Sequence, residues 1–382
     1  MTAVGFMAPS SKASGLAGVV AGETAISAVD REGLDLTYRG YSIRDLASQA
    51  TFEEVVYLLL YEKLPTEEEL RFFCQDLVRQ RGLPPEVCQI LERLPGSANP
   101  MDILRTGCSA LGAFEPERDP ERDQWKVAKR LVACFPSILL YWHRFHRDGQ
   151  RIETATGEPR TAAHFLSLLR GEREISPLEV RALDVSLILY AEHEFNASTF
   201  TCRTIASTLS DFYSAVTGGI GALRGPLHGG ANEAAMELIL RFKTPDEAEE
   251  GICQMLQRKE LVMGFGHRVY KKGDPRSRVL KEWAQKLAEL RADQRLFPIC
   301  ERIEKVMFRE KQLYPNVDFY GALTYYFLGI PIPMFTPLFV IARVAGWSAH
   351  IMEQRAHNRL IRPMGEYVGP SPRPYVPMHA RS

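Results

Sequence analysis

The sequence has no excess of charge of either sign. Its 382 residues include 47 Lys and Arg against 47 Asp and Glu, so the formal net charge is zero. A neutral chain lacks the overall basic charge that favours nucleic acid or an anionic membrane, although a local basic site is compatible with this balance. Because 45% of the residues are hydrophobic, disorder is also disfavoured. We expect a soluble globular protein with a sizeable core and with neither nucleic acid nor membrane as a partner.

Paired cysteines and targeting signals are missing as well. The seven cysteines are scattered and form no C-x-x-C pair, which is typical of buried thiols in a reducing compartment rather than of a disulfide or zinc framework. Residues 1–14 lack the basic and apolar regions of a secretory signal, and their single basic residue, Lys12, argues against a transit peptide. We therefore expect a cytoplasmic location.

No uninterrupted apolar run is suited to cross a membrane. The segment 319–342 is uncharged and approaches the length of a membrane span. However, Pro331, Pro333 and Pro337 would interrupt a single helix there. The segment is therefore predicted to be buried core.

Alternating residues, which indicate strands, are nearly confined to the start of the chain. Residues 24–29 and 34–38 alternate around a turn at 30–33, which predicts one β-hairpin. From Ile43 onward the apolar residues follow a helical period, so the fold class is mainly α. Helices are expected around 101–114, 124–145, 162–169, 186–223, 232–242, 245–259, 274–290, 298–310, 319–328 and 338–359. The proline-rich segment 369–382 is expected to form an extended arm.

Several familiar catalytic motifs are absent. The segment 193–197 is not H-E-x-x-H, and the histidines at 143 and 146 have no further ligands nearby, so a metal site is weakly supported. The segment 219–221 does not complete G-x-G-x-x-G, and no G-x-S-x-G is present.

Three segments nevertheless combine glycine with histidine or aspartate. The first, RGPLHGGANE at 224–233, places His228 between the end of one predicted helix and the start of the next. The positive end of the following helix would favour a neutral imidazole, which can donate a hydrogen bond to a developing oxyanion. A loop histidine that only caps a helix is the alternative interpretation.

The second and third segments are VMGFGHRVYKKGDPR at 262–276 and PNVDFYG at 315–321. The second can present backbone groups to a flat ring and cations to phosphates or carboxylates, although a solvated basic turn would look the same. In the third, Asp318 is by propensity a helix N-cap. Its apolar neighbours could also desolvate it enough to remove a proton from carbon.

Together, these three segments resemble the active-site segments of the citrate synthase family, in the same order. The resemblance runs nearly from end to end and includes GLAGVVAGETAISAVD, LYAEHEFNASTF and FTPLFVIARVAGWSAHIMEQ. The stretches GALRGPLHGGANE and ILLYWHRFHRDG, with LYAEHEFNASTF, most resemble the 2-methylcitrate synthase branch of that family.

The resemblance implies condensation of an acyl-CoA with oxaloacetate through an enol or enolate, followed by hydrolysis of the thioester. It implies that Asp318 removes the α-proton, that His228 hydrogen-bonds the thioester oxygen and that His267 polarises the ketone. Propionyl-CoA, giving 2-methylcitrate, is the expected acyl substrate, and acetyl-CoA, giving citrate, is the alternative. One methyl group in a pocket is worth only about 1–3 kcal/mol, so an enzyme of either kind can accept both. No cofactor and no metal are expected.

The matching positions also imply the binding residues. Oxaloacetate carries two carboxylates, which planar guanidinium groups bind well. The corresponding arginines are Arg276, Arg343 and Arg362, and His193 is an additional hydrogen-bond donor. The equivalent of Arg362 comes from the neighbouring subunit, so the resemblance implies a homodimer with shared sites. Coenzyme A is expected to contact Val262, Met263, Gly264, Phe265, Gly266, Arg268, Lys271 and Lys272.

The implied architecture is a citrate-synthase-like two-domain helical fold. A large domain, residues 1–228 and 330–382, would form the dimer and carry the C-terminal arm, and a small domain, residues 229–329, would be inserted into it. Gly229 and Gly329 suit hinges for a closure over oxaloacetate that excludes water. A non-catalytic helical binding scaffold of the same fold is the alternative from another class, but a scaffold does not require the catalytic set and the arginines together.

Overall fold

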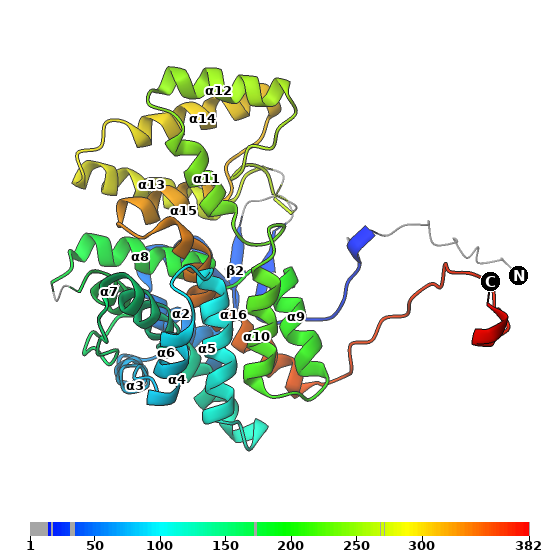
Figure 1. The fold of residues 1–382 in the computed structure, drawn as a ribbon. Helices are drawn as coiled ribbons and strands as arrows, with labels where there is room; N and C mark the ends of the chain where they lie inside the picture. Colours follow the sequence, from blue (N-terminus) through cyan, green and yellow to red (C-terminus); the bar gives the residue numbers. More distant parts are fainter. Residues whose placement is uncertain are drawn as a thin grey trace, which may run out of the picture.

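The computed structural model describes residues 14–16, 18–30, 35–171, 174–267, 269–270 and 272–381. Within these ranges the protein has sixteen α-helices and one small antiparallel sheet (Figure 1), so the mainly α fold class is confirmed. The strands are β1 (Ser27–Val29), β2 (Leu36–Tyr38) and β3 (Tyr41–Ser42). The helices are α1 (Ile43–Gln49), α2 (Phe52–Tyr61), α3 (Glu67–Arg79), α4 (Pro85–Arg93), α5 (Pro100–Phe114), α6 (Pro120–Asp148), α7 (Thr161–Arg170), α8 (Pro177–Tyr190), α9 (Ala197–Ser207), α10 (Phe212–Leu223), α11 (Ala231–Leu240), α12 (Pro245–Gln257), α13 (Pro275–Leu290), α14 (Leu296–Lys311), α15 (Val317–Phe327) and α16 (Phe335–Ala356), with short 3₁₀ turns η1 (Ser14–Leu16), η2 (Ile332–Met334) and η3 (Met378–Ala380).

The predicted β-hairpin is confirmed, and it has a third strand. β1 pairs antiparallel with β2, with Ser27 opposite Tyr38, and β2 pairs with β3. Most of the predicted turn, residues 31–33, lies outside the described residues. β3 was not predicted because two residues are too few to establish an alternating pattern.

Local signals explain many helix boundaries. Thr66 and Glu69 form a capping box at the start of α3. Each side chain accepts a hydrogen bond from a backbone N–H group that has no partner within the helix. Helix α6 begins at Pro120, before its predicted start at residue 124. Proline is favourable in the first turn, because the N–H group that it lacks would have no partner within the helix.

The helix predicted at 186–223 is wrong as a single element. The stretch contains the end of α8 and all of α9 and α10, because the side chains of Asn196 and Asp211 each cap a new helix. Glu194 and Leu209 adopt left-handed backbone in the two connections. The glycines do permit close packing, since a Cβ on Gly219 would lie 2.4 Å from Sγ of Cys202.

Helix α16 forms the centre of the larger, lower body in Figure 1. It packs against α2, α6, α8, α9 and α10, and every residue from Phe335 to Ile351 is buried. Among the described residues, Ile332–Ala356 is the one helical stretch long and apolar enough to cross a membrane, but 89% of its most apolar window is buried inside the protein. The prediction of buried core for 319–342 is thus confirmed, and Pro331 and Pro333 separate α15 from α16.

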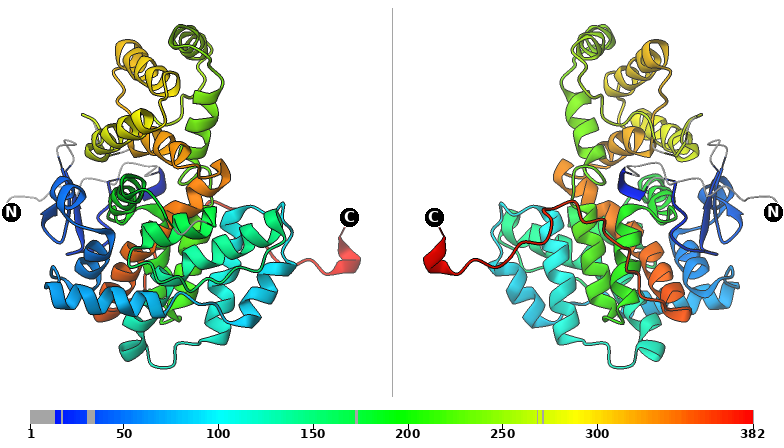
Figure 2. Two further views of the ribbon diagram at one scale, coloured as in Figure 1. Left: turned by 90° about the vertical axis from the view of Figure 1, so that its left-hand side faces the viewer. Right: turned by 90° about the vertical axis from the view of Figure 1, so that its right-hand side faces the viewer.

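Helices α11 to α15 gather above this body (Figure 1), where α13 and α11 pack on α15 and α12 packs on α14. Below them, α1 and α8 contact α13. The chain leaves α16 as an exposed segment, residues 362–381, that extends away from the body in both Figure 1 and Figure 2. The predicted extended arm is therefore confirmed, apart from the single turn η3.

Candidate active site

His228 lies between α10 and α11 and has a defined tautomer. Its Nε2 lies 2.8 Å from the hydroxyl of Ser198 and accepts a hydrogen bond from the backbone N–H of Ser198 at 3.2 Å. Because Nε2 accepts, a neutral ring carries its proton on Nδ1. Burial, and then the charge of Arg343, lowers the pKa of His228 to about 4. Burial and the charge of Arg343 thus favour the neutral imidazole expected from the sequence, and the contribution of the end of the following helix stays a prediction.

Asp318 lies in the first turn of α15 and is not its cap. The N-cap is Asn316, whose side-chain oxygen accepts from the N–H of Asp318 at 3.0 Å, so the N-cap interpretation of Asp318 is wrong. The Asp318 carboxylate therefore does not cap the helix, and it accepts a hydrogen bond from the hydroxyl of Tyr190 at 2.9 Å. Burial raises the pKa of Asp318, and Tyr190 and Arg276 only partly oppose this effect. Such a carboxylate is a stronger base than an exposed one.

His267 and His193 come together around Tyr270. Nδ1 of His267 accepts from the N–H groups of Val269 and Tyr270 at 3.1 and 3.2 Å, so a neutral His267 carries its proton on Nε2. Nε2 of His193 lies 3.0 Å from the hydroxyl of Tyr270, and the two imidazole rings are 5.3 Å apart. Burial, and then the charge of Arg276, holds the pKa of His193 well below its ordinary value. The structure thus joins two histidines that are far apart in the sequence.

Arg343 brings a buried, incompletely paired cation from α16. Its Nε donates to the carbonyl of Tyr190 at 2.8 Å, and its guanidinium carbon lies 4.6 Å from the centre of the Phe339 ring. Its Nη1 is buried and has no hydrogen-bond partner among the described residues. Burial lowers the pKa of Arg343 to about 10, although the charge of Glu192 opposes this change. A buried N–H group without a hydrogen-bond partner destabilises the folded protein. A carboxylate bound next to Nη1 would supply the missing acceptor.

Arg276 is buried and already paired. Its Nε and Nη2 donate to the two carboxylate oxygens of Asp274 at 2.9 and 2.8 Å. Asp274 also caps α13 and accepts from the N–H of Val317 at 3.1 Å. Burial disfavours the charge of Arg276, but Asp274 outweighs it, and the pKa of Arg276 is raised. Within the described part of the chain, the two N–H groups of Nη1 and the second N–H of Nη2 of Arg276 are not used by Asp274.

The glycine loop before His267 is fixed against the start of α15. The carbonyls of Gly264 and Gly266 accept from the backbone and side-chain N–H groups of Asn316 at 2.9 and 3.0 Å, and the N–H of Gly266 donates to the carbonyl of Tyr314 at 3.0 Å. Gly264 has a φ of +87°, and a Cβ there would lie 2.9 Å from Cβ of Phe319. These contacts place the loop backbone beside Asp318.

The other residues predicted to bind coenzyme A are less constrained. Val262 is buried, Met263 and Phe265 are half-buried, and the Phe265 ring packs 4.6 Å from that of Phe319. Lys272 is exposed. Arg268 and Lys271 lie outside the described residues.

Arg362 is not brought to the other predicted residues by this chain. It is exposed where the chain leaves α16 for the C-terminal arm, which points away from the body in Figure 2. Within the part of the chain that the structure describes, no hydrogen bond or ion pair joins Arg362 to the site.

Sequence reasoning missed several residues that hold the site together. They are Tyr190, Ser198, Tyr270, Asp274 and Phe339. Phe339, for example, lies 6.4 Å from the His228 ring and 4.7 Å from the Tyr190 ring, measured between ring centres. In the sequence Tyr190 and Phe339 look like ordinary helix core, whereas Tyr270 lies within the candidate segment 262–276. The prediction that Asp274 and Pro275 start a helix is confirmed, but the pairing of Asp274 with Arg276 was not predicted.

Thiols and potential metal ligands do not cluster. All seven cysteines are free, and four of them are buried. In the described ranges, no group of three or more His, Cys, Asp or Glu side chains is arranged to hold a metal ion. The absence of a metal from the reaction stays a prediction from the sequence.

Comparison with known proteins identifies the family. The family model described as "Citrate synthase, C-terminal domain" matches residues 15–364. A 2-methylcitrate synthase of Shewanella oneidensis is 54% identical over 96% of this chain and 98% of that protein, and citrate synthase 2 of Bacillus subtilis is 43% identical over 96% and 99%. A solved ternary complex of Thermoplasma acidophilum citrate synthase with carboxymethyl coenzyme A and oxaloacetate has a TM-score of 0.89 and 34% identity, covering 95% of this chain and 98% of that one. The resemblance seen in the sequence is confirmed, and the chain belongs to the citrate synthase family.

Proposed function

We propose that this protein is an acyltransferase that condenses propionyl-CoA with oxaloacetate and hydrolyses the resulting thioester to 2-methylcitrate and CoA. The observation that carries the proposal is the convergence of a buried carboxylate, Asp318, with neutral His228 and the unpaired Nη1 of Arg343. The 54% identical relative named 2-methylcitrate synthase favours propionyl-CoA. Relatives named citrate synthase keep acetyl-CoA as the alternative. The thioester is a substrate, and no separate cofactor is proposed.

In the first step, Asp318 takes a proton from the carbon next to the thioester carbonyl. The electron pair of that C–H bond moves toward the thioester oxygen, where Nδ1–H of His228 donates a hydrogen bond to the developing negative charge. A positioned base contributes about 10²–10⁴-fold and an oxyanion donor about 10²–10³-fold to the rate. The Tyr190 hydroxyl donates to Oδ1 of Asp318 and so orients the carboxylate, which leaves Oδ2 to accept the proton.

In the second step, the enol carbon attacks the ketone of oxaloacetate and forms the new carbon–carbon bond. Nε2–H of His267 donates to the ketone oxygen as it becomes an alkoxide. His193, Arg343, Nη1 of Arg276 and the partner-derived Arg362 hold the carboxylates. Water then cleaves the thioester, and CoA leaves as the thiol.

The acyl preference tests this proposal directly. Purified protein with oxaloacetate should show a higher kcat/KM for propionyl-CoA than for acetyl-CoA, within the about 10–200-fold that one methyl group can provide. Release of free CoA measures both reactions. A strong preference for acetyl-CoA would make the protein a citrate synthase, and no turnover of either thioester would contradict the condensation.

The pH dependence should follow Asp318 and not His228. Asp318 must be ionised to act as a base, and burial raises its pKa above the ordinary 3.8, so kcat/KM should fall as the pH is lowered through that raised value. His228, with a pKa of about 4, should remain neutral from about pH 5 to 8. A pH profile of kcat/KM for the acyl-CoA checks this. Activity that is lost as the pH rises through about 6.5 would instead indicate an imidazolium donor.

The two-domain organisation forms part of the proposal. Helices α11 to α15 would belong to the small domain, residues 229–329, and the remainder, residues 1–228 and 330–382, to the large one. At Gly229 only glycine fits, because a Cβ there would lie 2.1 Å from the carbonyl oxygen of Leu223. Gly329 has a φ of +71° in open space, which suits a hinge. We propose that closure about these points excludes water from the reaction.

We further propose a soluble, cytoplasmic homodimer in which Arg362 completes the neighbouring site. In a mixture of inactive Arg362→Met and Asp318→Asn chains, each mixed dimer would contain one intact site, so random exchange should restore about a quarter of the wild-type activity. Assays before and after subunit exchange measure this. Recovery of no activity, despite mixed dimers detected by mass spectrometry, would contradict sharing.

A further inference from the structure

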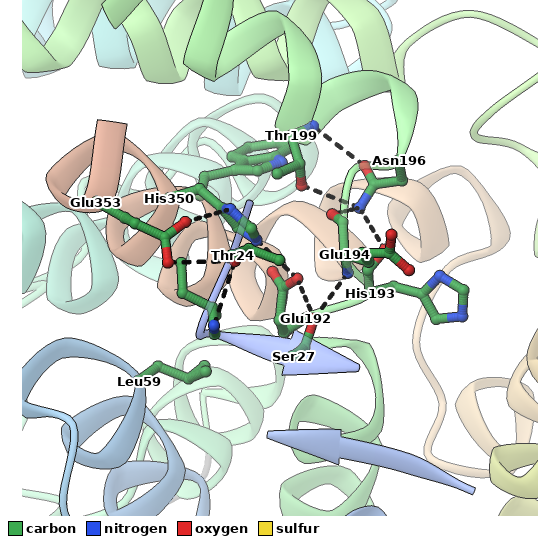
Figure 3. Close-up of polar contacts among 12 residues, drawn as sticks. Thr24, Ser27, Leu59, Glu192, His193, Glu194, Asn196, Thr199, His350 and Glu353 are labelled. Carbon is green, nitrogen blue, oxygen red and sulfur yellow. Dashed lines mark hydrogen bonds and ion pairs between the residues drawn. The ribbon is translucent and has the colours of Figure 1, made fainter. Parts of the chain in front are cut away.

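The loop that carries His193 is held by the first strand of the chain. The hydroxyl of Ser27 on β1 donates to Oε1 of Glu192 at 3.0 Å and accepts from the N–H of Glu194 at 3.0 Å. Its two partners are therefore the residues immediately before and after His193. Glu194 has a φ of +53°, a left-handed conformation that residues other than glycine adopt rarely. In Figure 3, Ser27 lies below this bend, and the His193 ring points away from it.

A second hydroxyl holds the same loop from the neighbouring strand. Tyr38 is the cross-strand partner of Ser27, so their side chains share one face of the sheet. The Tyr38 hydroxyl lies 2.9 Å from the carbonyl of Glu192 and 3.1 Å from that of Ile188, either of which can accept its proton, and it accepts from the N–H of Glu192 at 3.2 Å. Tyr38 is completely buried, and burial raises its pKa, so the hydroxyl keeps its proton. Backbone and side chain of Glu192 are thus both fixed by one cross-strand pair.

The position of the Glu192 carboxylate is restricted by His350 on one side and by Gly346 on the other. Nε2 of His350 lies 2.9 Å from its Oε1. Arg203, which can only donate, contacts Nδ1 of His350 at 3.1 Å, so a neutral His350 has its proton on Nε2, facing Glu192. On the other side, a Cβ on Gly346 would lie 2.2 Å from Oε2 of Glu192. Burial favours protonation of Glu192, but His350, Arg343 and the Ser27 hydroxyl together lower its pKa.

We propose that Ser27 and Tyr38 are positioning residues for oxaloacetate recognition: this cross-strand hydroxyl pair fixes the Glu192–Glu194 bend and thereby aims His193 at the substrate. The inference rests on the proposed binding role of His193. Neither hydroxyl touches the substrate. The ring of His193 meets Tyr270 at 3.0 Å, so a shift of the bend would also move His193 relative to that residue and to His267. The small sheet then serves the active site rather than the core alone.

Ser27→Ala and Tyr38→Phe test the proposal, because each removes only a hydroxyl. Each should weaken oxaloacetate binding by about tenfold, the scale of a lost hydrogen bond to a charged or buried group. The KM for the acyl-CoA should change by less than about twofold, since the His228 and Asp318 contacts are untouched. Isothermal titration with oxaloacetate alone and steady-state kinetics with both substrates measure the two quantities.

Thr24→Val is the matched control. Thr24 precedes β1 and donates to Glu353 at 3.3 Å, but it does not contact the His193 bend. This variant should keep wild-type oxaloacetate affinity, and Ser27→Thr, which restores a hydroxyl, should recover most of the loss in Ser27→Ala. Thermal unfolding of each variant reports any general destabilisation.

Two results would overturn the positioning role. The first is wild-type oxaloacetate affinity in Tyr38→Phe or in folded Ser27→Ala. The second is evidence of a purely structural effect. It would be seen as an equal rise in KM for oxaloacetate and acyl-CoA, or as the same loss of oxaloacetate affinity in Thr24→Val. A failure of the proposed function is distinguishable, because the wild-type protein would then condense neither thioester.

Discussion

Asp318→Asn should lower kcat by about 10²–10⁴-fold, the range of a positioned base, while oxaloacetate still binds with near wild-type affinity. The amide has the shape of the carboxylate, and its oxygen can still accept the hydrogen bond of Tyr190, found at 2.9 Å in the native protein. It cannot accept the α-proton of the thioester. Release of CoA measures the loss of turnover, and isothermal titration measures oxaloacetate binding.

Asp184→Asn is the corresponding control for a buried carboxylate. Asp184 lies on α8, accepts from the N–H of Phe52 at 3.0 Å and pairs with Arg181 at 2.6 Å, and burial raises its pKa to about 6. Its amide variant should alter thermal stability and leave kcat within about twofold, because it contacts none of the proposed catalytic groups. Near-normal turnover in Asp318→Asn would refute its assignment as the base.

His228→Gln should lower kcat by about 10²–10³-fold, the scale for loss of one oxyanion donor. The tautomer makes the prediction specific. Nε2 accepts from Ser198, so the proton is on Nδ1, which in the proposed mechanism faces the thioester. An asparagine amide nitrogen overlays Nδ1, whereas a glutamine amide nitrogen overlays Nε2, so His228→Asn should retain more activity than His228→Gln. Steady-state kinetics of the two variants measure the difference.

His164→Gln provides the control for loss of a buried histidine. His164 is completely buried, lies 3.3 Å from the hydroxyl of Ser137 and 2.8 Å from that of Thr156, and has a pKa that burial lowers well below its ordinary value. Its replacement should destabilise the fold and spare kcat. If His228→Gln were as active as His228→Asn, the proton would not be on Nδ1 in the reacting enzyme.

Prediction from the sequence succeeded where the signal is local. The alternation at 24–29 and 34–38 needs only a short window to indicate a hairpin, and Pro331 and Pro333 mark the gap between two helices by their own chemistry. The break at Asn196 was missed, because an apolar pattern on both sides outweighed a single capping residue.

The site was predictable as a set of residues but not as an arrangement. His228, His267 and Asp318 were found through the family resemblance, since each alone has an ordinary explanation. The pairing of Arg276 with Asp274 and the contact of Asp318 with Tyr190 depend on how distant helices pack. No periodicity or spacing in one chain encodes such contacts, because they arise from tertiary structure.

The unpaired Nη1 of Arg343 has a consequence for how the free protein resists unfolding. A buried guanidinium group whose Nη1 has no hydrogen-bond partner among the described residues makes the free protein less stable than an apolar side chain of similar size would make it. In the proposed function, the helix at the middle of the hydrophobic core therefore carries, at Arg343, one partner of an ion pair that a carboxylate of the bound substrate would complete. Binding of oxaloacetate, as proposed, would supply the missing acceptor and so stabilise the folded protein against unfolding.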